Sequence, residues 1–249
     1  MRKHIGHLIY KWIGTPNFIR IIEWRSMLEW LEPKEGERIL DVACGAGTLS
    51  LKIAERGCKV HGIDLSEKVI NSAKRLAERE KIVCKFKIGS AEDLPYPNEY
   101  FDKVVFSSSL EHIEDDIKAL EEACRVLKLN GSIVLTVPSL TYLIGDKIKE
   151  RHRKIAYVVN YYTHETMKNK FEMTGFSMVR SKYLLNSCLT TFFCKIGIKL
   201  GWSGVLWFCM FPVAYLCLVS DKLFEVKDKG YTLIAEGRKF GTKSGINDG

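Results

Sequence analysis

Strand-like and helix-like segments alternate along the chain from residue 39 onwards, and this alternation limits the fold more than any other feature. Short apolar segments predict seven strands, at 39–43, 59–63, 83–88, 103–106, 132–137, 176–184 and 231–238. Helical patterns separate several of them, at 48–56, 66–80, 115–127 and 163–174. Strands joined by helices favour a parallel sheet that is covered on both faces. We therefore expect an α/β, Rossmann-like fold: a doubly wound, mostly parallel seven-stranded sheet with an apolar helical insertion before the last strand.

Length and composition favour one domain with an insertion. The chain has 249 residues, of which 46% are hydrophobic and 27% charged, ordinary values for a soluble globular protein. We divide it into an N-terminal helical segment (1–35), a sheet-forming core (36–184), an apolar helical hairpin (185–229) and a last strand with a flexible tail (230–249).

Charge and cysteine usage indicate the compartment. The net charge of +8 would allow contact with nucleic acid or an anionic membrane, but scattered surface lysines give the same total. None of the eight cysteines forms a C-x-x-C pair, and Cys44, Cys58 and Cys84 lie in or beside apolar strands, where a free cysteine is a small core residue. The N-terminus has no signal-peptide pattern. We expect a reducing, cytoplasmic location and no disulfide framework.

The loop after the first strand has the pattern Asp41-x-x-x-Gly45-x-Gly47. In a doubly wound sheet, ligands bind at the carboxyl ends of the strands. A dinucleotide fingerprint would have a third glycine where Ser50 stands, and no Gly-Lys-Ser/Thr follows. An acid at the end of the strand would also repel a pyrophosphate. The loop suits a ligand that lacks phosphate and carries a positive group and a ribose.

Five motifs in this order resemble those of class I S-adenosylmethionine-dependent methyltransferases, with the type 11 methyltransferase group as the nearest likeness. They are DVACGAG, GIDLS, GSAEDLP, FDKVVFSSSLEHI and RVLKLNGSIVLTVP. The resemblance covers about residues 36 to 140, together with NYYTHETMKNKFEMTGF. It implies S-adenosyl-L-methionine as the cofactor.

The resemblance also implies which residues bind this cofactor. Asp41 would accept a hydrogen bond from the methionine ammonium, Asp64 would accept from both ribose hydroxyls, and Leu65 would pack on the adenine. Ser90, Ala91 and Glu92 would hold the adenine edge, although a turn with an acid at a helix start explains them too. The full set is Asp41, Ala43, Gly45, Gly47, Asp64, Leu65, Ser90, Ala91, Glu92 and Ser107.

His112 is the candidate catalytic base. It follows the fourth strand at the expected mouth of the pocket, and a histidine accepts a proton near neutral pH. The alternative is that His112 only bonds a nearby backbone group, and we expect Glu111 to pair with a surface lysine. Some similar methyltransferases hold a metal through Glu-x-x-Glu-His, but Ser108 stands at the first position, so we expect no metal.

The family's substrate entrance would fall on His152, Tyr161 and Tyr162. His152 lies in the basic segment KIKERHRK, which would either meet an anionic acceptor such as a phosphate or carboxylate, or form a solvated charged helix. No Asn/Asp-Pro-Pro-Tyr/Phe segment follows the fourth strand, so we expect no nucleic-acid partner.

The insertion before the last strand carries no charge from residue 200 to residue 220. That length would span a membrane, but a single span would separate the last strand from its sheet. We therefore expect two apolar helices, at 187–200 and 204–224, forming a hairpin over the substrate mouth. Flanking lysines favour contact with a membrane interface, which would make the protein peripheral; a homodimer interface and a dry lid are the alternatives.

These observations predict a methyltransferase with an apolar or membrane-associated acceptor: a quinone, a polyprenyl or glycolipid intermediate, or a phospholipid head group. Two other interpretations stay open. One is a soluble small-molecule O- or N-methyltransferase whose hairpin forms a dimer interface. The other is a non-catalytic cofactor-binding module.

Overall fold

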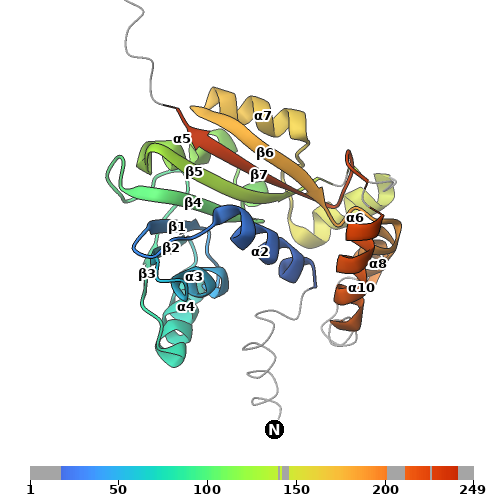
Figure 1. The fold of residues 1–249 in the computed structure, drawn as a ribbon, viewed down its shortest axis with the longest axis horizontal. Coiled ribbons are helices and arrows are strands. Elements are labelled where there is room, and N and C mark those ends of the chain that lie inside the picture. The colour runs from blue at the N-terminus through green and yellow to red at the C-terminus, as the bar shows by residue number, and fades with distance from the viewer. Residues whose placement is uncertain (1–17, 140, 142–145, 201–210, 225, 241–249) are drawn as a thin grey trace, which may run out of the picture.

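The computed structural model describes residues 18–139, 141, 146–200, 211–224 and 226–240 (Figure 1). They form a sheet of seven strands in the order β3-β2-β1-β4-β5-β7-β6. The strands are β1 (Arg38–Val42), β2 (Lys59–Asp64), β3 (Cys84–Ile88), β4 (Phe101–Ser107), β5 (Leu127–Pro138), β6 (Phe176–Leu184) and β7 (Thr232–Lys239). The first five are parallel, whereas β7 is antiparallel to both β5 and β6. The predicted mostly parallel, Rossmann-like sheet is confirmed.

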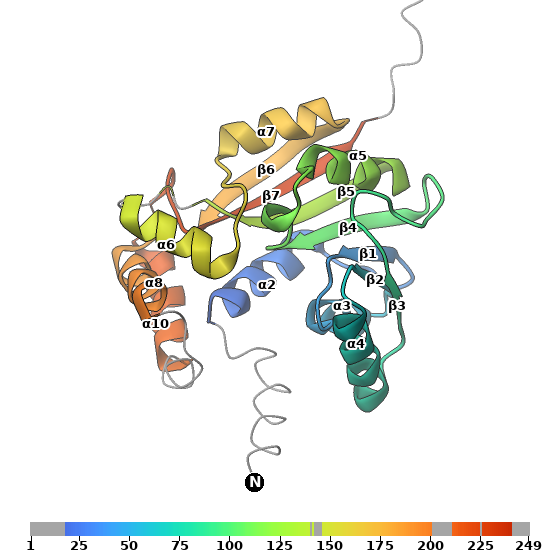
Figure 2. The ribbon, with the colours of Figure 1, turned by 180° about the vertical axis from the view of Figure 1, so that it is seen from behind.

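Helices cover both faces of the sheet, as the two opposite views show (Figures 1 and 2). They are α2 (Phe18–Leu31), α3 (Thr48–Ala54), α4 (Glu67–Glu80), α5 (Asp116–Val126), α6 (Asp146–Ala156), α7 (His164–Met173), α8 (Cys188–Leu200) and α10 (Phe211–Leu223). Ser66 is the N-cap of α4, as expected, and its hydroxyl accepts from the Val69 amide. The first 17 residues of the predicted N-terminal helical segment lie outside the described residues.

The side chains of β1 alternate between two hydrophobic cores. Ile39 packs with α2 and α3 on one face, through residues such as Ile22 and Ile53. Leu40 and Val42 belong to the core on the other face, which also includes residues of α5 and α7. Successive side chains of a strand point to opposite faces, so Asp41 shares the face of Ile39 and meets α3. The alternation thus fixes the direction of the first predicted ligand-binding carboxylate.

One local difference from the prediction concerns Asn130 and Gly131. We predicted the fifth strand over 132–137, but β5 begins at Leu127 and includes both residues. Its pairing with β4 changes register between Phe101 and Lys103, and Asn130 has a positive φ of 60°. The longer strand therefore contains an irregularity at this point.

The expected hairpin has two helices, α8 and α10, although residues 201–210 between them lie outside the described part. Asp221 joins the pair, because its carboxylate accepts from the Ser187 amide and the Thr190 hydroxyl. Both helices lie beside α6, away from the β3 and α4 end (Figures 1 and 2). Among the described helices, none is both long and apolar enough to cross a bilayer.

Candidate active site

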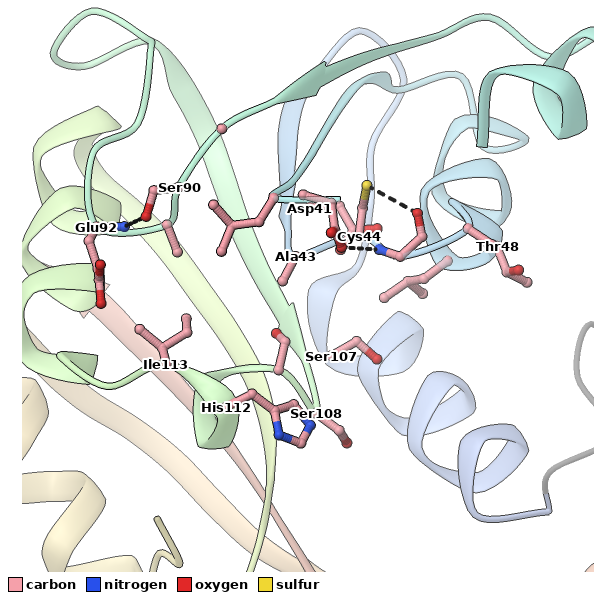
Figure 3. Close-up of a pocket in the computed structure, with 18 of the residues that line it drawn as sticks. Asp41, Ala43, Cys44, Thr48, Ser90, Glu92, Ser107, Ser108, His112 and Ile113 are labelled. Carbon is pink, nitrogen blue, oxygen red and sulfur yellow. Dashed lines mark hydrogen bonds between the residues drawn. The ribbon is translucent and has the colours of Figure 1, made fainter. Parts of the chain in front are cut away.

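A cavity of about 680 Å³ opens at the carboxyl ends of β1, β2 and β4. Such an edge is where ligands bind in doubly wound sheets. Figure 3 shows Asp41, Ala43 and Cys44 on one side, Ser90, Glu92 and Ile113 on the other, and Ser107, Ser108 and His112 along the base. The structure thus brings together residues from four of the five sequence motifs. Every predicted cofactor-binding residue except Gly47 lines this cavity.

Asp64 holds the loop after β1 in place. The Gly45 amide donates to one oxygen of the Asp64 carboxylate at 3.0 Å, and the Ser66 amide donates to the other oxygen at 3.0 Å. Gly45 has a left-handed φ of 54°, and a Cβ built on it would meet nothing within 4 Å. The loop therefore leaves open space beside a carboxylate that is oriented by backbone amides.

Asp41 is a buried acid, with 1% of its surface exposed. The Ser50 hydroxyl of α3 donates to its Oδ2 atom at 2.6 Å. Burial raises the pKa of Asp41 to about 7, more than the Ser50 hydrogen bond lowers it. No ion pair to Asp41 is formed by the residues that the structure describes. A cationic ligand in the cavity would supply the missing opposite charge.

The other predicted residues form the far wall. Leu65 is 72% exposed at the rim, so an apolar ring could cover it. The Ser90 hydroxyl accepts from the Glu92 amide at 3.1 Å, and Glu92 in turn accepts from the Asp115 amide. The turn is therefore present, but no helix begins at Glu92; its carboxylate instead lies at the start of α5, the next α-helix along the chain. The same residues line the cavity, and their contact with the adenine stays a prediction.

Gly47 has another role than the one predicted. It does not line the cavity. Its φ is 78°, and a Cβ there would lie 2.8 Å from the Phe86 ring. The glycine is needed for the close packing of α3 on β3 rather than for room beside the ligand.

Glu111 departs from its prediction as well. We expected it to pair with a surface lysine, but it is 4% exposed and lies within the short η1 helix, Leu110–His112. Its Oε2 atom has no hydrogen-bond partner among the described residues. Burial raises the pKa of Glu111 to about 8. The neighbouring His112 is exposed in the cavity, where its Nδ1 atom lies 3.1 Å from the Tyr157 carbonyl oxygen. The structure therefore contains the expected backbone contact and also places His112 at the mouth.

A second cavity of about 270 Å³ adjoins the first, and Arg20, Ser108 and His112 line both. Its wall comes from α2, η1, α6 and the start of β7, which contribute Glu23, Glu111, His152 and Tyr231 among others. The hairpin helices α8 and α10 line neither cavity with their described residues. The described residues of α8 pack against α6 and those of α10 against α2. A hairpin that covers the mouth stays a prediction, because residues 201–210 lie outside the described part.

The three predicted substrate residues are only partly brought to this cavity. His152 lines it, with Nδ1 at 3.0 Å from the Tyr161 hydroxyl and Nε2 at 2.8 Å from the Tyr231 hydroxyl. Burial lowers the pKa of His152 to about 4. Tyr161 is not among the lining residues, but its hydroxyl contacts His152, which is one of them. Tyr162 is placed elsewhere: it is 1% exposed in the core, and its hydroxyl donates to Asp116 at 2.7 Å.

Sequence reasoning missed the contribution of α2. The indole of Trp24 donates to the Ser107 hydroxyl at 2.9 Å, and Arg20 donates to the Ser107 carbonyl at 3.1 Å. The Glu23 carboxylate accepts from Arg20, Ser108 and Thr232. Arg20, Glu23 and Trp24 are not distinguished by sequence from the other polar residues of α2, and nothing in the sequence joined residues more than 80 positions apart.

Comparison with known proteins decides the family. Residues 33–182, more than half of the chain, match the family model of a methyltransferase domain. The chain belongs to the S-adenosylmethionine-dependent methyltransferases. The resemblance to this family is thereby confirmed, and S-adenosylmethionine is its cofactor.

Two curated relatives are named as quinone methyltransferases. The ubiquinone/menaquinone biosynthesis C-methyltransferase UbiE of Rickettsia rickettsii is 31% identical over 172 residues, which are 66% of this chain and 66% of that protein. The demethylmenaquinone methyltransferase of Clavibacter sepedonicus is 39% identical over 194 residues, 69% of this chain and 77% of that protein. The match thus spans about two thirds of the Rickettsia protein's length.

Solved structures share the fold. YcgJ of Bacillus subtilis has a TM-score of 0.64 at 18% identity, over 88% of this chain and 98% of that chain. A geranyl diphosphate methyltransferase in complex with its methyl donor has a TM-score of 0.66 at 15% identity, over 87% of this chain and 84% of that chain.

The residues of the larger cavity fit this cofactor. The buried Asp41 carboxyl group would face the ammonium group, the oriented carboxylate oxygens of Asp64 would accept from the ribose hydroxyls, and the open space beside Gly45 would take the aminoacyl portion. Leu65 and Ala91 provide an apolar surface for the adenine. The position of the acids at the ends of β1 and β2 matches the charge distribution of the ligand.

Proposed function

We propose that this protein transfers a methyl group from S-adenosylmethionine to a quinone-type acceptor, a hydroxylated aromatic ring that carries an apolar chain. The observation that carries the proposal is the second cavity. It adjoins the cofactor cavity through Arg20, Ser108 and His112, so a ring held there would face the donor. A volume of about 270 Å³ suits a small ring, whereas a long apolar chain would extend outside.

The relatives support this acceptor class over the others that the sequence left open. Proteins named for ubiquinone or menaquinone biosynthesis match at 31% and 39% identity. A quinone precursor is also the acceptor that combines a small polar ring with a membrane-soluble chain.

The chain's own residues would bind, align and protect the reactants. When bound, S-adenosylmethionine supplies a methyl group that is already activated on a sulfonium. The protein therefore needs to hold the acceptor in line and exclude water, and alignment alone contributes several kcal/mol. His112 lines both cavities and is positioned to accept the proton that the acceptor loses.

The hairpin is our proposed membrane contact. Its described residues expose several large apolar side chains, namely Leu189, Phe192, Leu216, Val219, Leu223 and Phe224. Lys199, Lys222 and Lys227 are exposed at the ends of the helices. Apolar side chains flanked by lysines complement an anionic bilayer surface. Because the hairpin packs on α2 and α6, which form walls of the second cavity, a docked hairpin would place that cavity near the lipid.

The test is mass spectrometry of lipid and quinone extracts incubated with the protein and methyl-labelled cofactor. We expect the label in a quinone-type product that has gained one methyl group. Label in a phospholipid or polyprenyl product would show that the acceptor belongs to that class and is not a quinone. A complete absence of labelled product, with cofactor binding intact, would favour the non-catalytic interpretation.

A further inference from the structure

The second cavity has an unusual balance of charge. Two carboxyl groups, Glu23 and Glu111, line it, and both are less than 5% exposed. Arg20 also lines it and donates to Glu23 at 3.3 Å. One guanidinium thus stands beside two buried acids. Burial of a charge without a partner is costly, so this cavity has room for a hydrogen-bond donor but not for a further negative charge.

Glu111 is the acid whose hydrogen bonds are incomplete. Both carboxylate oxygens of Glu23 accept hydrogen bonds, one from Thr232 and the other from Ser108 and Arg20. By contrast, Oε2 of Glu111 has no partner in the described structure, and Oε1 lies 3.8 Å from Nε2 of His112. A buried carboxyl oxygen without a partner costs on the order of 1–3 kcal/mol. A ligand hydroxyl in the cavity, with a small shift of the side chain, would satisfy it.

The histidine of the cavity does not supply a positive charge. The Tyr161 hydroxyl donates to the Lys149 carbonyl, so its oxygen accepts from Nδ1–H of His152. The Tyr231 hydroxyl then donates to Nε2. Both ring nitrogens are engaged in a neutral imidazole, in agreement with the pKa of about 4. Within the basic segment, His152 therefore contributes a neutral side chain to the cavity.

We propose that this second cavity is the acceptor's head-group site, that it selects an uncharged ring bearing a hydroxyl over an anionic ring, and that Glu111 receives the hydroxyl hydrogen bond. The inference rests on the proposed function, because it takes the cavity as the acceptor site, and it deepens it by naming the head-group chemistry.

Three ring compounds of similar size test the selectivity by isothermal titration calorimetry on the full chain. The probes are 1-naphthol, 1-methoxynaphthalene and 1-naphthoate, in slightly alkaline buffer above the Glu111 pKa of about 8. We expect 1-naphthol to bind about tenfold or more tightly than either other probe, because a hydrogen bond to a charged group contributes roughly 1.5–3 kcal/mol. Equal affinities, or tighter binding of the carboxylate, would overturn the inference.

The substitution Glu111→Gln tests the assignment to this residue. We expect the preference for 1-naphthol over 1-naphthoate to fall to about threefold or less, because the loss of the charge removes both the strong acceptor and the repulsion. The matched control is Glu121→Gln, at a half-exposed position of α5 outside both cavities. An unchanged preference in folded Glu111→Gln protein would remove Glu111 from the site. If the variant does not fold, the three-probe comparison on the wild type still decides.

The outcomes separate this inference from the proposed function. A retained 1-naphthol preference without any methylated quinone would overturn the proposed function alone. A methylated quinone without the preference would overturn the head-group assignment alone.

Discussion

Asp41 and Asp64 end neighbouring strands, yet the structure prepares them differently. Asp64 is oriented by two backbone amides, from Gly45 and Ser66. Asp41 is buried, and its carboxyl group accepts a hydrogen bond from the Ser50 hydroxyl. Asp64 is therefore ready to accept directional hydrogen bonds, and Asp41 is ready to receive a positive charge. An Asp64 variant with its control and a pH series distinguish these roles.

Substitution of Asp64→Asn should weaken S-adenosylmethionine binding by about 10- to 100-fold, because charge-assisted hydrogen bonds contribute roughly 1.5–3 kcal/mol. Calorimetric titration measures this affinity. Asp228→Asn, at an exposed position outside both cavities, is the matched control and should bind normally. Unchanged affinity in the Asp64 variant would refute the assigned cofactor site.

Cofactor affinity should rise several-fold as the pH increases through the Asp41 pKa of about 7. The carboxylate form pairs with an ammonium, and the protonated form does not. The stability of the cofactor-free protein should change in the opposite direction. Because the folded pKa of Asp41 is raised from 3.8, its contribution to stability is present at low pH and is lost as the pH rises through about 7. Titrations at several pH values measure the first effect and thermal unfolding measures the second; an affinity that is flat with pH would contradict the role of Asp41.

At the scale of elements, the two glycines of the loop between β1 and α3 have different roles: one leaves room for a ligand, and the other allows close packing of the core. Gly45 and Gly47 both have positive φ, but the space beside them differs. Beside Gly45 there is open space, whereas beside Gly47 lies the Phe86 ring of β3. The sequence pattern marked both glycines as ligand contacts. Only the position of β3, which is set by long-range strand pairing, shows that one of them serves the core.

Gly45→Ala and Gly47→Ala should therefore have different effects. Each variant pays about 1 kcal/mol for an alanine in the left-handed region. Gly47→Ala adds a contact of 2.8 Å with Phe86 and should lower the melting temperature markedly more. Gly45→Ala should mainly weaken cofactor binding, because its methyl group would stand beside the cavity. Thermal unfolding and calorimetric titration of both variants check this, and a reversed order of stability would contradict it.

The sequence predicted local elements well and long-range contacts poorly. Strand β2 and helix α4 begin within one residue of their expected positions, since apolar patterning and the Ser66 cap are local signals. The places of Arg20, Trp24 and Glu23 depend on how α2 packs on the finished sheet. The burial of Tyr162, beside the half-exposed Tyr161, likewise depends on Asp116 from another helix.

At the scale of the whole molecule, the hairpin and the cofactor site are linked through α2 and α6. Arg151 of α6 donates to the carbonyl oxygens of Ile198 and Lys199, at the end of α8. The same α6 supplies His152 to the second cavity. A hairpin on a membrane would thus be connected mechanically to the acceptor site.

Removal of exposed apolar side chains from the hairpin should reduce membrane binding. The double variant Phe192→Ser and Leu223→Ser removes two side chains that are 58% and 69% exposed. We expect about tenfold or greater loss of sedimentation with anionic vesicles, since burial of such side chains contributes roughly 1.5–3 kcal/mol each. Leu129→Ser, at a similarly exposed position on β5, is the control. Equal sedimentation of all three proteins would contradict membrane contact by the hairpin.

The central claim is methyl transfer from S-adenosylmethionine to a quinone-type ring. Its most direct test is a turnover assay in which the protein, methyl-labelled cofactor and reduced demethylmenaquinone in anionic vesicles are incubated, and the quinone is analysed by mass spectrometry. We predict a product with one added labelled methyl group, formed by the wild type and the Asp228→Asn control and strongly reduced in Asp64→Asn. A wild-type protein that binds the cofactor but leaves the quinone unlabelled would contradict the account.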